Sequence, residues 1–518
     1  MELNQGTVGA ALTSARGDRG DKPFLNFGDD TYTYADVEEH SARAANGLRE
    51  LGVQRGDHVA LLLPNLPEFL WAWFGAARLG APIVPVNVAL KGDGLVHIVD
   101  HSDSETMIVH ADLLDQVEAV RERLPKLRRV VVVGGDAGDH VAWKRLVAAD
   151  PTDADDPAIA AGDLMLVMYT SGTTGLPKGV VIPQAQIMGG PGLLSFAGIT
   201  PDDVLYTCLP LFHANAAIIS VWGAFGLGTR LAVAPRFSAS RFWDDIRRYG
   251  ATEFNSLGAM LPILHKQPPR DDDRDHPCRI VVSAACPAEI WEAFEDRFGV
   301  EIIEFYGTVE GGLTMAGPDA PAGSIGRPLP INEMRIVRGD DNVCDSYEIG
   351  EIVSRPIAGG PLARYYKNEP ATADKTRGGW MRSGDLAYAD DDGYLWFVDR
   401  KTDSMRRRGE NISSYEVERT LNEHPGVLES AVYAVPSELG EDDVMAALVL
   451  QPGARFDPES VLRHCEDRMA YFMVPRYLRV VDELPKTGTH RVQKATLRAE
   501  AITADTWDRE AAGYEMRR

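Results

Sequence analysis

The sequence predicts an α/β protein with a large N-terminal domain, made of two helix-covered β-sheets plus a β-rich subdomain, and a small α+β C-terminal domain. Short apolar runs alternate with helical patterns as far as residue 303, which is typical of parallel sheets covered by helices. Short strand patterns without helices then follow, and the pattern changes again beyond Lys401. At 518 residues the chain is also too long for one compact core.

The first sheet is predicted in the N-terminal quarter of the chain. Apolar side chains recur there every three to four residues in helical stretches, and short apolar runs separate these stretches. The predicted helices cover residues 34–51 and 68–79, and the predicted strands cover residues 58–63, 83–86, 106–109 and 130–133. This alternation is that of βαβ units, so we expect a parallel sheet covered by helices.

An acidic stretch over residues 150–163 follows, and we expect it to be a solvated surface connector. A buried strand over 164–168 and a second α/β layout come next. The strands of that layout are predicted at residues 204–209, 229–233, 280–282 and 301–303, and those of the β-rich subdomain at 333–337 and 350–354.

The C-terminal unit is predicted from helices over 416–423 and 458–469 and strands over 430–435 and 444–450. We place the boundary after residue 402, which gives domains over residues 1–402 and 403–518. A unit of about a hundred residues lies in the usual size range of a domain.

Composition excludes several classes of protein. The net charge of −24 argues against a nucleic-acid or anionic-membrane surface. No stretch reaches the ~18 apolar residues of a membrane span, and the first residues lack the features of a secretory signal. Five scattered cysteines show no metal-like pairing. We therefore expect a reduced, cytoplasmic setting.

The segment Tyr169–Val180, YTSGTTGLPKGV, is predicted to bind phosphate, and we call it the phosphate grip. Its glycines, Gly172 among them, let the backbone fold tightly with its amides exposed. Lys178 adds a cation, and four hydroxyls are supplied by Thr170, Ser171, Thr173 and Thr174. The alternative is a solvated turn. Because Lys178 is flanked by Pro177 and Gly179, the segment is not a Walker A loop, which disfavours a P-loop kinase or ATPase.

A second motif, Phe305-Tyr-Gly-Thr-Val-Glu310, follows the strand predicted at residues 301–303. Tyr306 offers a flat ring for a purine base, and Gly307 permits close approach. Glu310 offers oxygen ligands for Mg²⁺. Alone this motif would be a turn, whereas beside the phosphate grip it predicts a nucleotide site.

These motifs stand in the order and spacing of the adenylate-forming superfamily, and the chain resembles its acyl-CoA synthetase branch. Within that branch it looks most like bacterial ligases of the crotonobetaine/carnitine-CoA ligase type. The resemblance implies an AMP-forming ligase that uses ATP, Mg²⁺ and coenzyme A to activate a small-molecule carboxylic acid. It also implies that the N-terminal domain binds ATP and the acyl group and that the C-terminal domain is mobile. No nucleic-acid partner is expected, and monomer and homodimer stay open.

The resemblance assigns roles to further residues. His213, in Pro210-Leu-Phe-His213, would border and gate the acyl pocket. Asp385 would accept hydrogen bonds from the ribose hydroxyls, and Arg400 would reach the nucleotide. Asp403 would be the hinge about which the C-terminal domain turns. The path of coenzyme A would pass Arg408 and Gly409.

The sequence departs from the family pattern at three places. Val309 stands where the family has a threonine directed at the α-phosphate, and whether Thr308 replaces it is open. Arg408 stands in place of the first of two glycines, where it would contact coenzyme A or narrow its tunnel. Arg491 stands in place of the adenylation lysine, so either Arg491 does this work or Lys494 takes it over.

Two other functions remain as alternatives. One is an adenylating enzyme that passes the acyl group to a carrier protein or another nucleophile, which the changes at Arg408 and Arg491 allow. The other is a non-catalytic nucleotide-binding protein, which the changes at Val309 and Arg491 allow.

Overall fold

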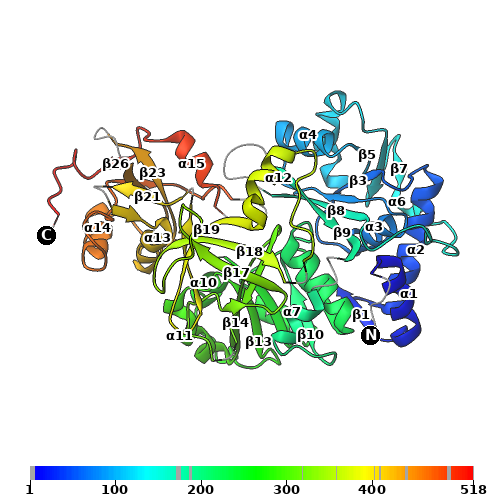
Figure 1. Cartoon of the computed structure of the whole chain (residues 1–518), viewed down its shortest axis with the longest axis horizontal. Coiled ribbons are helices and arrows are strands. Elements are labelled where there is room, and N and C mark those ends of the chain that lie inside the picture. Colours follow the sequence, from blue (N-terminus) through cyan, green and yellow to red (C-terminus); the bar gives the residue numbers. More distant parts are fainter. Residues whose placement is uncertain are drawn as a thin grey trace. The chain divides into compact units, whose positions relative to one another are not determined.

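The computed structural model describes residues 6–170, 177–185, 190–258, 260–317, 319–357, 359–401, 403–407, 410–437, 442–486 and 492–516. The chain divides into two compact units (Figure 1). Unit 1 comprises Met1–Gly311, Met315–Ala322 and Pro361–Gly378, and unit 2 comprises Gly312–Thr314, Gly323–Gly360 and Gly379–Arg518. The predicted boundary after residue 402 falls inside unit 2 and stays a prediction.

The first sheet of unit 1 has, among the described residues, seven strands in the order β7, β6, β5, β3, β4, β8, β9. They are β3 (His58–Leu62), β4 (Ile83–Pro85), β5 (Ser104–His110), β6 (Arg129–Val133), β7 (Val141–Ala142), β8 (Leu164–Thr170) and β9 (Lys178–Pro183). Neighbours are parallel except β8 and β9, which form an antiparallel hairpin. The strands predicted here are confirmed, because their apolar side chains lie in one buried core.

The second sheet of unit 1 contains the run β14, β13, β12, β10, β11, β1, β2. These strands are β1 (Pro23–Phe27), β2 (Asp30–Thr33), β10 (Val204–Thr207), β11 (Arg230–Val233), β12 (Glu253–Leu257), β13 (Ile280–Ala284) and β14 (Glu301–Thr308). Within this run only β1 and β2 pair antiparallel in the described residues. The predicted α/β layout is confirmed, and the hairpin of β1 and β2 is an addition to it.

Helices connect the strands of unit 1 and cover the sheets (Figure 1). The α-helices are α1 (Val8–Arg19), α2 (Tyr34–Glu50), α3 (Pro67–Arg78), α4 (Gly92–His101), α5 (Leu114–Glu118), α6 (Trp143–Leu146), α7 (Gly190–Phe196), α8 (Gly223–Leu227), α9 (Phe242–Tyr249), α10 (Met260–His265), α11 (Ala288–Phe298) and α12 (Glu369–Lys375). A π-helix, η4 (Asn215–Trp222), and the 3₁₀ turns η1 (Ala111–Leu113) and η2 (Arg121–Arg123) complete this list. Helix α2 begins where predicted because Thr33 and Asp36 form a capping box.

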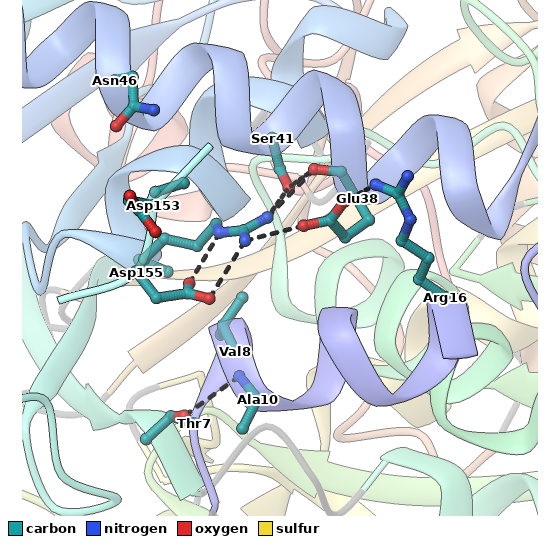
Figure 2. Close-up of polar contacts among 12 residues, drawn as sticks. Thr7, Val8, Ala10, Arg16, Glu38, Ser41, Asn46, Asp153 and Asp155 are labelled. Carbon is teal, nitrogen blue, oxygen red and sulfur yellow. Dashed lines mark hydrogen bonds and ion pairs between the residues drawn. The ribbon is translucent and has the colours of Figure 1, made fainter. Parts of the chain in front are cut away.

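An ion network centred on the buried side chain of Arg78 joins α2, α3 and the acidic connector in the N-terminal part of unit 1. The side chain of Arg78 is 3% exposed. Its guanidinium donates to the Glu38 carboxylate at 2.8 Å and to the two Asp155 oxygens at 2.8 and 3.1 Å. Figure 2 labels three members of this network, Glu38, Ser41 and Asp155, with Arg16 on the far side of Glu38. The connector stays at the surface, as predicted, with the Asp155 side chain 42% exposed, and its carboxylate pairs there with the buried guanidinium of Arg78.

Unit 2 contains an antiparallel sheet in the order β17, β18, β19, β20 and a second sheet in the order β23, β24, β25, β26. The first sheet consists of β17 (Asn332–Val337), β18 (Gly350–Pro356), β19 (Met381–Ala389) and β20 (Leu395–Arg400). The second consists of β23 (Val427–Pro436), β24 (Asp442–Leu450), β25 (Tyr477–Val480) and β26 (Trp507–Asp508).

Shorter strands and three helices complete the C-terminal part of the fold. They are β21 (Met405–Arg407), β22 (Glu410–Ile412), α13 (Ser414–Glu423), α14 (Pro458–Glu466) and α15 (Lys494–Glu500). The chain passes from one unit to the other within β15 (Gly311–Met315) and within the turn η5 (Arg377–Gly379), whereas β16 (Arg327–Pro328) lies in unit 2. The predicted β-rich subdomain and α+β unit are both confirmed. Across the described ranges, no helix is at once long enough and apolar enough to cross a membrane.

Candidate active site

The phosphate grip is the loop of the hairpin formed by β8 and β9. Thr170 ends β8, Lys178 begins β9, and these two residues pair in the antiparallel register. The loop therefore leaves the carboxyl end of a buried strand, where open α/β sheets bind ligands. Four predicted phosphate-binding residues lie outside the described residues: Ser171, Gly172, Thr173 and Thr174.

A tyrosine that sequence analysis missed connects the phosphate grip to the second motif. The Lys178 ammonium lies 5.4 Å from the centre of the Tyr365 ring. The Tyr365 hydroxyl donates to Glu310 Oε1 at 2.7 Å, and burial together with the Glu310 charge raises the pKa of Tyr365. Two predicted site residues thus contact the same aromatic side chain, Lys178 over its ring and Glu310 at its hydroxyl. The only sequence signal was the pair Tyr365-Tyr366 beside a polar turn.

Backbone pairing fixes Tyr365 beside the grip. Val181 in β9 donates to the Arg364 carbonyl at 2.9 Å, and Tyr366 donates to the Gly179 carbonyl at 2.7 Å. The segment that carries Tyr365 is thereby tied to the strand that begins at Lys178. The Glu310 carboxylate has about four lone-pair sites, so its contact with Tyr365 is compatible with holding a cation.

Tyr306, Gly307 and Thr308 lie at the carboxyl end of β14, as the motif predicted. The Thr308 hydroxyl donates to the Gly311 carbonyl at 2.7 Å. Its hydrogen is therefore used within the turn, while the oxygen keeps the capacity to accept. In this arrangement Thr308 does not donate a hydrogen bond to a phosphate. It therefore does not take the place of the threonine that the family pattern has at position 309.

Glu304, two residues before Tyr306, is a buried carboxyl that sequence analysis missed. It accepts hydrogen bonds from the backbone amides of Ala285 and Cys286, the latter at 3.2 Å. Ala285 has φ of 75°, in the left-handed region, so two successive amides converge on the carboxylate. Burial raises the pKa of Glu304 to about 7, although the amide hydrogen bonds lower it.

His213 follows β10 and lies against Phe212, with ring centroids 4.6 Å apart. Burial lowers the pKa of His213 to about 4, so the imidazole is neutral near pH 7. Its Nε2 atom is buried without a hydrogen-bond partner among the described residues. A neutral, poorly solvated ring fits the predicted role in a pocket wall better than a role in proton transfer.

In unit 2 the predicted ribose and nucleotide residues face each other across two strands. Asp385 in β19 pairs in register with Arg400 in β20. Arg400 Nε lies 3.4 Å from Asp385 Oδ1, and Asp385 is only 3% exposed. The predicted hinge residue, Asp403, forms an ion pair with Arg498 at 2.5 Å.

Lys494 begins α15 and is held by two partners, the buried Ser414 and the partly buried Glu418. Its Nζ atom donates to Ser414 Oγ at 2.6 Å and pairs with Glu418 Oε1 at 2.8 Å. Ser414 also contacts Asp399, whose pKa burial raises. Neither Ser414 nor Glu418 was predicted as a site residue. Arg408, Gly409 and Arg491 lie outside the described residues.

Comparison with known proteins decides the family. The family model for "AMP-binding enzyme" matches residues 12–366, and that for "AMP-binding enzyme C-terminal domain" matches residues 416–491. The chain belongs to the AMP-binding enzyme family. The resemblance stated from the motifs is thereby confirmed.

Individual members of this family match nearly the whole chain. A steroid-22-oyl-CoA synthetase of Rhodococcus jostii is 35% identical over 98% of this chain and 93% of its own length. A medium/long-chain-fatty-acid–CoA ligase of Mycobacterium marinum is 35% identical over 94% of each chain. The crystal structure of an anthranilate CoA ligase with anthranoyl-AMP superimposes with a TM-score of 0.88 at 27% identity, covering 98% of both chains.

This AMP-binding enzyme is an ATP-dependent acyl-CoA ligase that proceeds through an acyl-adenylate, with a carboxylic acid, ATP and coenzyme A as substrates and Mg²⁺ as its cofactor. The predicted activity and cofactors are confirmed. Among the described residues no three His, Cys, Asp or Glu side chains gather as a multi-ligand metal site requires. Glu310 as a protein ligand of the cation is compatible with this, because Mg²⁺ is commonly held by one or two carboxylates and substrate phosphates.

Proposed function

We propose that the chain joins a carboxylic acid to free coenzyme A in two half-reactions, with the predicted site residues in the roles given below. The arrangement of Lys178, Tyr365 and Glu310 carries this proposal, since it puts a cation and a carboxylate at the base of the phosphate grip. Glu310 would hold Mg²⁺, which when bound neutralises charge on the phosphates. Tyr365 keeps the Glu310 carboxylate oriented.

In the first half-reaction a carboxylate oxygen of the acid attacks the α-phosphorus of ATP in line. The bond between the α-phosphorus and its bridging oxygen breaks, and pyrophosphate leaves with the bonding electrons. The phosphate grip and Lys178 bind the phosphates, with hydroxyls from Thr170, Ser171, Thr173 and Thr174. Tyr306, Gly307 and Thr308 lie beside the base, and Asp385 and Arg400 bind the ribose and the nucleotide.

One cation must stabilise the charge that builds up on the carboxylate and the α-phosphate. The described contacts of Lys494 compete with that role, because its ammonium would first have to leave Glu418 and Ser414. Arg491 is therefore the better candidate of the two. Removing one preorganised donor of this kind typically costs ~10²–10³ in rate.

In the second half-reaction the C-terminal domain turns about Asp403 and admits coenzyme A past Arg408 and Gly409. The thiol sulfur attacks the acyl carbon, the thiol proton is lost to solvent, and AMP leaves with the bonding electrons. A turn at Asp403 requires that its ion pair with Arg498 be broken or carried along. His213 gates the acyl pocket.

For the acid, we propose a large, mainly apolar acyl group. Two relatives at 35% identity are named for steroid-22-oyl and medium- or long-chain fatty acyl groups. The benzoate and anthranilate ligases of solved structure are 26% and 27% identical. We further propose a cytoplasmic location. Light scattering would distinguish a monomer from a homodimer, a choice that the sequence leaves open.

The test is pyrophosphate exchange over a panel of steroid, fatty and aromatic acids, followed by mass analysis of thioester formation with free coenzyme A. We expect exchange with a steroid or fatty acid and a thioester of the same acid. Exchange without a thioester would favour a carrier protein as the acceptor. The absence of exchange with every acid would instead favour a non-catalytic nucleotide-binding protein.

A further inference from the structure

Two histidines on one helix contact both ends of the phosphate grip. His97 and His101 lie one turn apart on α4 and therefore share a face of this helix. His97 Nε2 lies 2.9 Å from the Pro177 carbonyl oxygen, just before Lys178. His101 Nδ1 lies 2.7 Å from the hydroxyl of Tyr169, just before Thr170.

The chemistry of the partners determines which atom donates and which atom accepts in these two hydrogen bonds. A carbonyl only accepts, so His97 Nε2 carries a hydrogen and donates it to Pro177. Burial lowers the pKa of His101 and raises that of Tyr169, so the imidazole is neutral and the phenol keeps its proton. The Tyr169 hydroxyl therefore donates to His101 Nδ1.

The two histidines also contact each other and the same tyrosine ring. Their ring centroids lie 5.3 Å apart, and those of His97 and His101 lie 6.1 and 5.9 Å from the centroid of Tyr169. Tyr169 lies in β8 and pairs with Gly179 in β9, and Pro177 directly precedes β9. The contacts of α4 therefore reach the end of β8 and the start of β9.

The chain just beyond α4 is fixed in turn. The Tyr366 hydroxyl donates to Asp103 at 2.8 Å, and Lys126 pairs with Asp103 at 3.0 Å. Tyr366 also lies beside the His101 ring, with centroids 6.1 Å apart. These contacts hold the C-terminal end of α4 in place, and with it the positions of the two histidines.

We propose that His97 and His101 are positioning residues for ATP, which set the two ends of the phosphate grip. This inference rests on the proposed role of the grip in binding phosphate. A helix that touches both ends of a loop fixes the positions of these ends more tightly than the hairpin alone, so less conformational freedom is lost there when ATP binds. Neither histidine needs to contact the nucleotide.

The test compares His97→Ala, His101→Ala and His97→Gln with the wild-type protein by calorimetric titration with MgATP in the absence of the acid. Each alanine variant is expected to raise Kd for MgATP about three- to tenfold, which one net hydrogen bond produces. His97→Gln keeps an N–H donor and is expected to return Kd to within about twofold of wild type.

The matched control is His140→Ala, because His140 pairs with Glu118 at 3.2 Å in the same unit and contacts none of the described residues of the grip. It is expected to leave Kd for MgATP unchanged. In pyrophosphate exchange the alanine variants at positions 97 and 101 are expected to raise the KM for ATP and to leave that for the acid unchanged. A merely structural role would move both KM values and would not be rescued by glutamine.

Unchanged ATP affinity in both alanine variants would overturn the inference, as would a glutamine variant no better than alanine. A different result would contradict the proposed function: the wild-type protein would bind MgATP but would exchange no pyrophosphate with any acid. A Lys178→Ala variant with wild-type affinity for MgATP would remove the role of the grip and the inference with it.

Discussion

Replacing Arg78 with methionine removes a buried charge while keeping a long apolar side chain. The change deletes the guanidinium contacts to Glu38 at 2.8 Å and to Asp155 at 2.8 and 3.1 Å. Glu38 is left with its side chain only 10% exposed and with Arg16 as its remaining cation. Removing one partner of a buried ion pair costs about 3–5 kcal/mol, because the other charge stays buried. We therefore expect a loss of unfolding free energy of this size.

The assay is urea unfolding followed by tryptophan fluorescence, since Trp71, Trp73 and Trp222 are buried in unit 1. Far-UV circular dichroism is recorded in parallel, because a chain of two units need not unfold in one step.

The matched control is Arg16→Ala, which removes the other cation that contacts Glu38. The Arg16 side chain is 53% exposed, so its loss should cost less than about 1 kcal/mol. Adding Glu38→Gln to Arg78→Met should recover part of the lost stability, because the unpaired charge is gone. If Arg78→Met costs no more than Arg16→Ala, the argument from the buried charge is wrong.

Three further predictions concern the site. The folded-state pKa of Glu304, about 7 against an ordinary 4.5, means that the folded protein holds this proton more tightly. Stability should therefore fall by up to about 3 kcal/mol as pH rises from 4.5 to 7 and then level off, and thermal melts of Glu304→Gln should lose this slope. Lys494→Ala should destabilise the C-terminal part of unit 2 in chemical unfolding by about 3–5 kcal/mol, because it strands Glu418. Arg491→Ala should instead slow pyrophosphate exchange ~10²–10³-fold; equal effects of both variants on exchange would contradict this division. Because burial lowers the pKa of His213 to about 4, His213→Phe should alter acid selectivity in the panel without shifting the pH dependence of exchange between pH 6 and 8.

The architecture was predictable because strands buried on both faces leave continuous apolar runs in the sequence. Strands β3, β5, β6 and β8 are of this kind, and all were predicted. The hairpin of β1 and β2 was missed because neither strand has a continuous buried run: β1 buries only Phe24 and Leu25, and β2 buries none of its residues. The π-helix η4 was missed too, since a uniformly apolar run carries no helical period.

For the site, sequence analysis found what is local in the chain and missed what is assembled by pairing. The phosphate grip and the Tyr306–Glu310 motif are contiguous, so their residue types could be interpreted directly. The side chains that hold these motifs come from far away in the sequence. Tyr365 lies 55 positions from Glu310, and His101 lies 68 positions from Tyr169. No spacing rule links such pairs before the sheet is formed.

Lys494 shows why a motif alone does not assign a role. Its position in the sequence is equally consistent with an adenylation cation and with a structural ion pair. The partners that distinguish these roles, Glu418 and Ser414, are 76 and 80 positions away, at or near the start of α13. An ammonium held by a partly buried carboxylate and a hydroxyl must lose both contacts before it can reach a substrate, and each loss adds to the barrier. The motif alone does not distinguish the two roles of Lys494, whereas its contacts predict a free-energy cost for moving the ammonium to a substrate. The variants at positions 491 and 494 test this prediction.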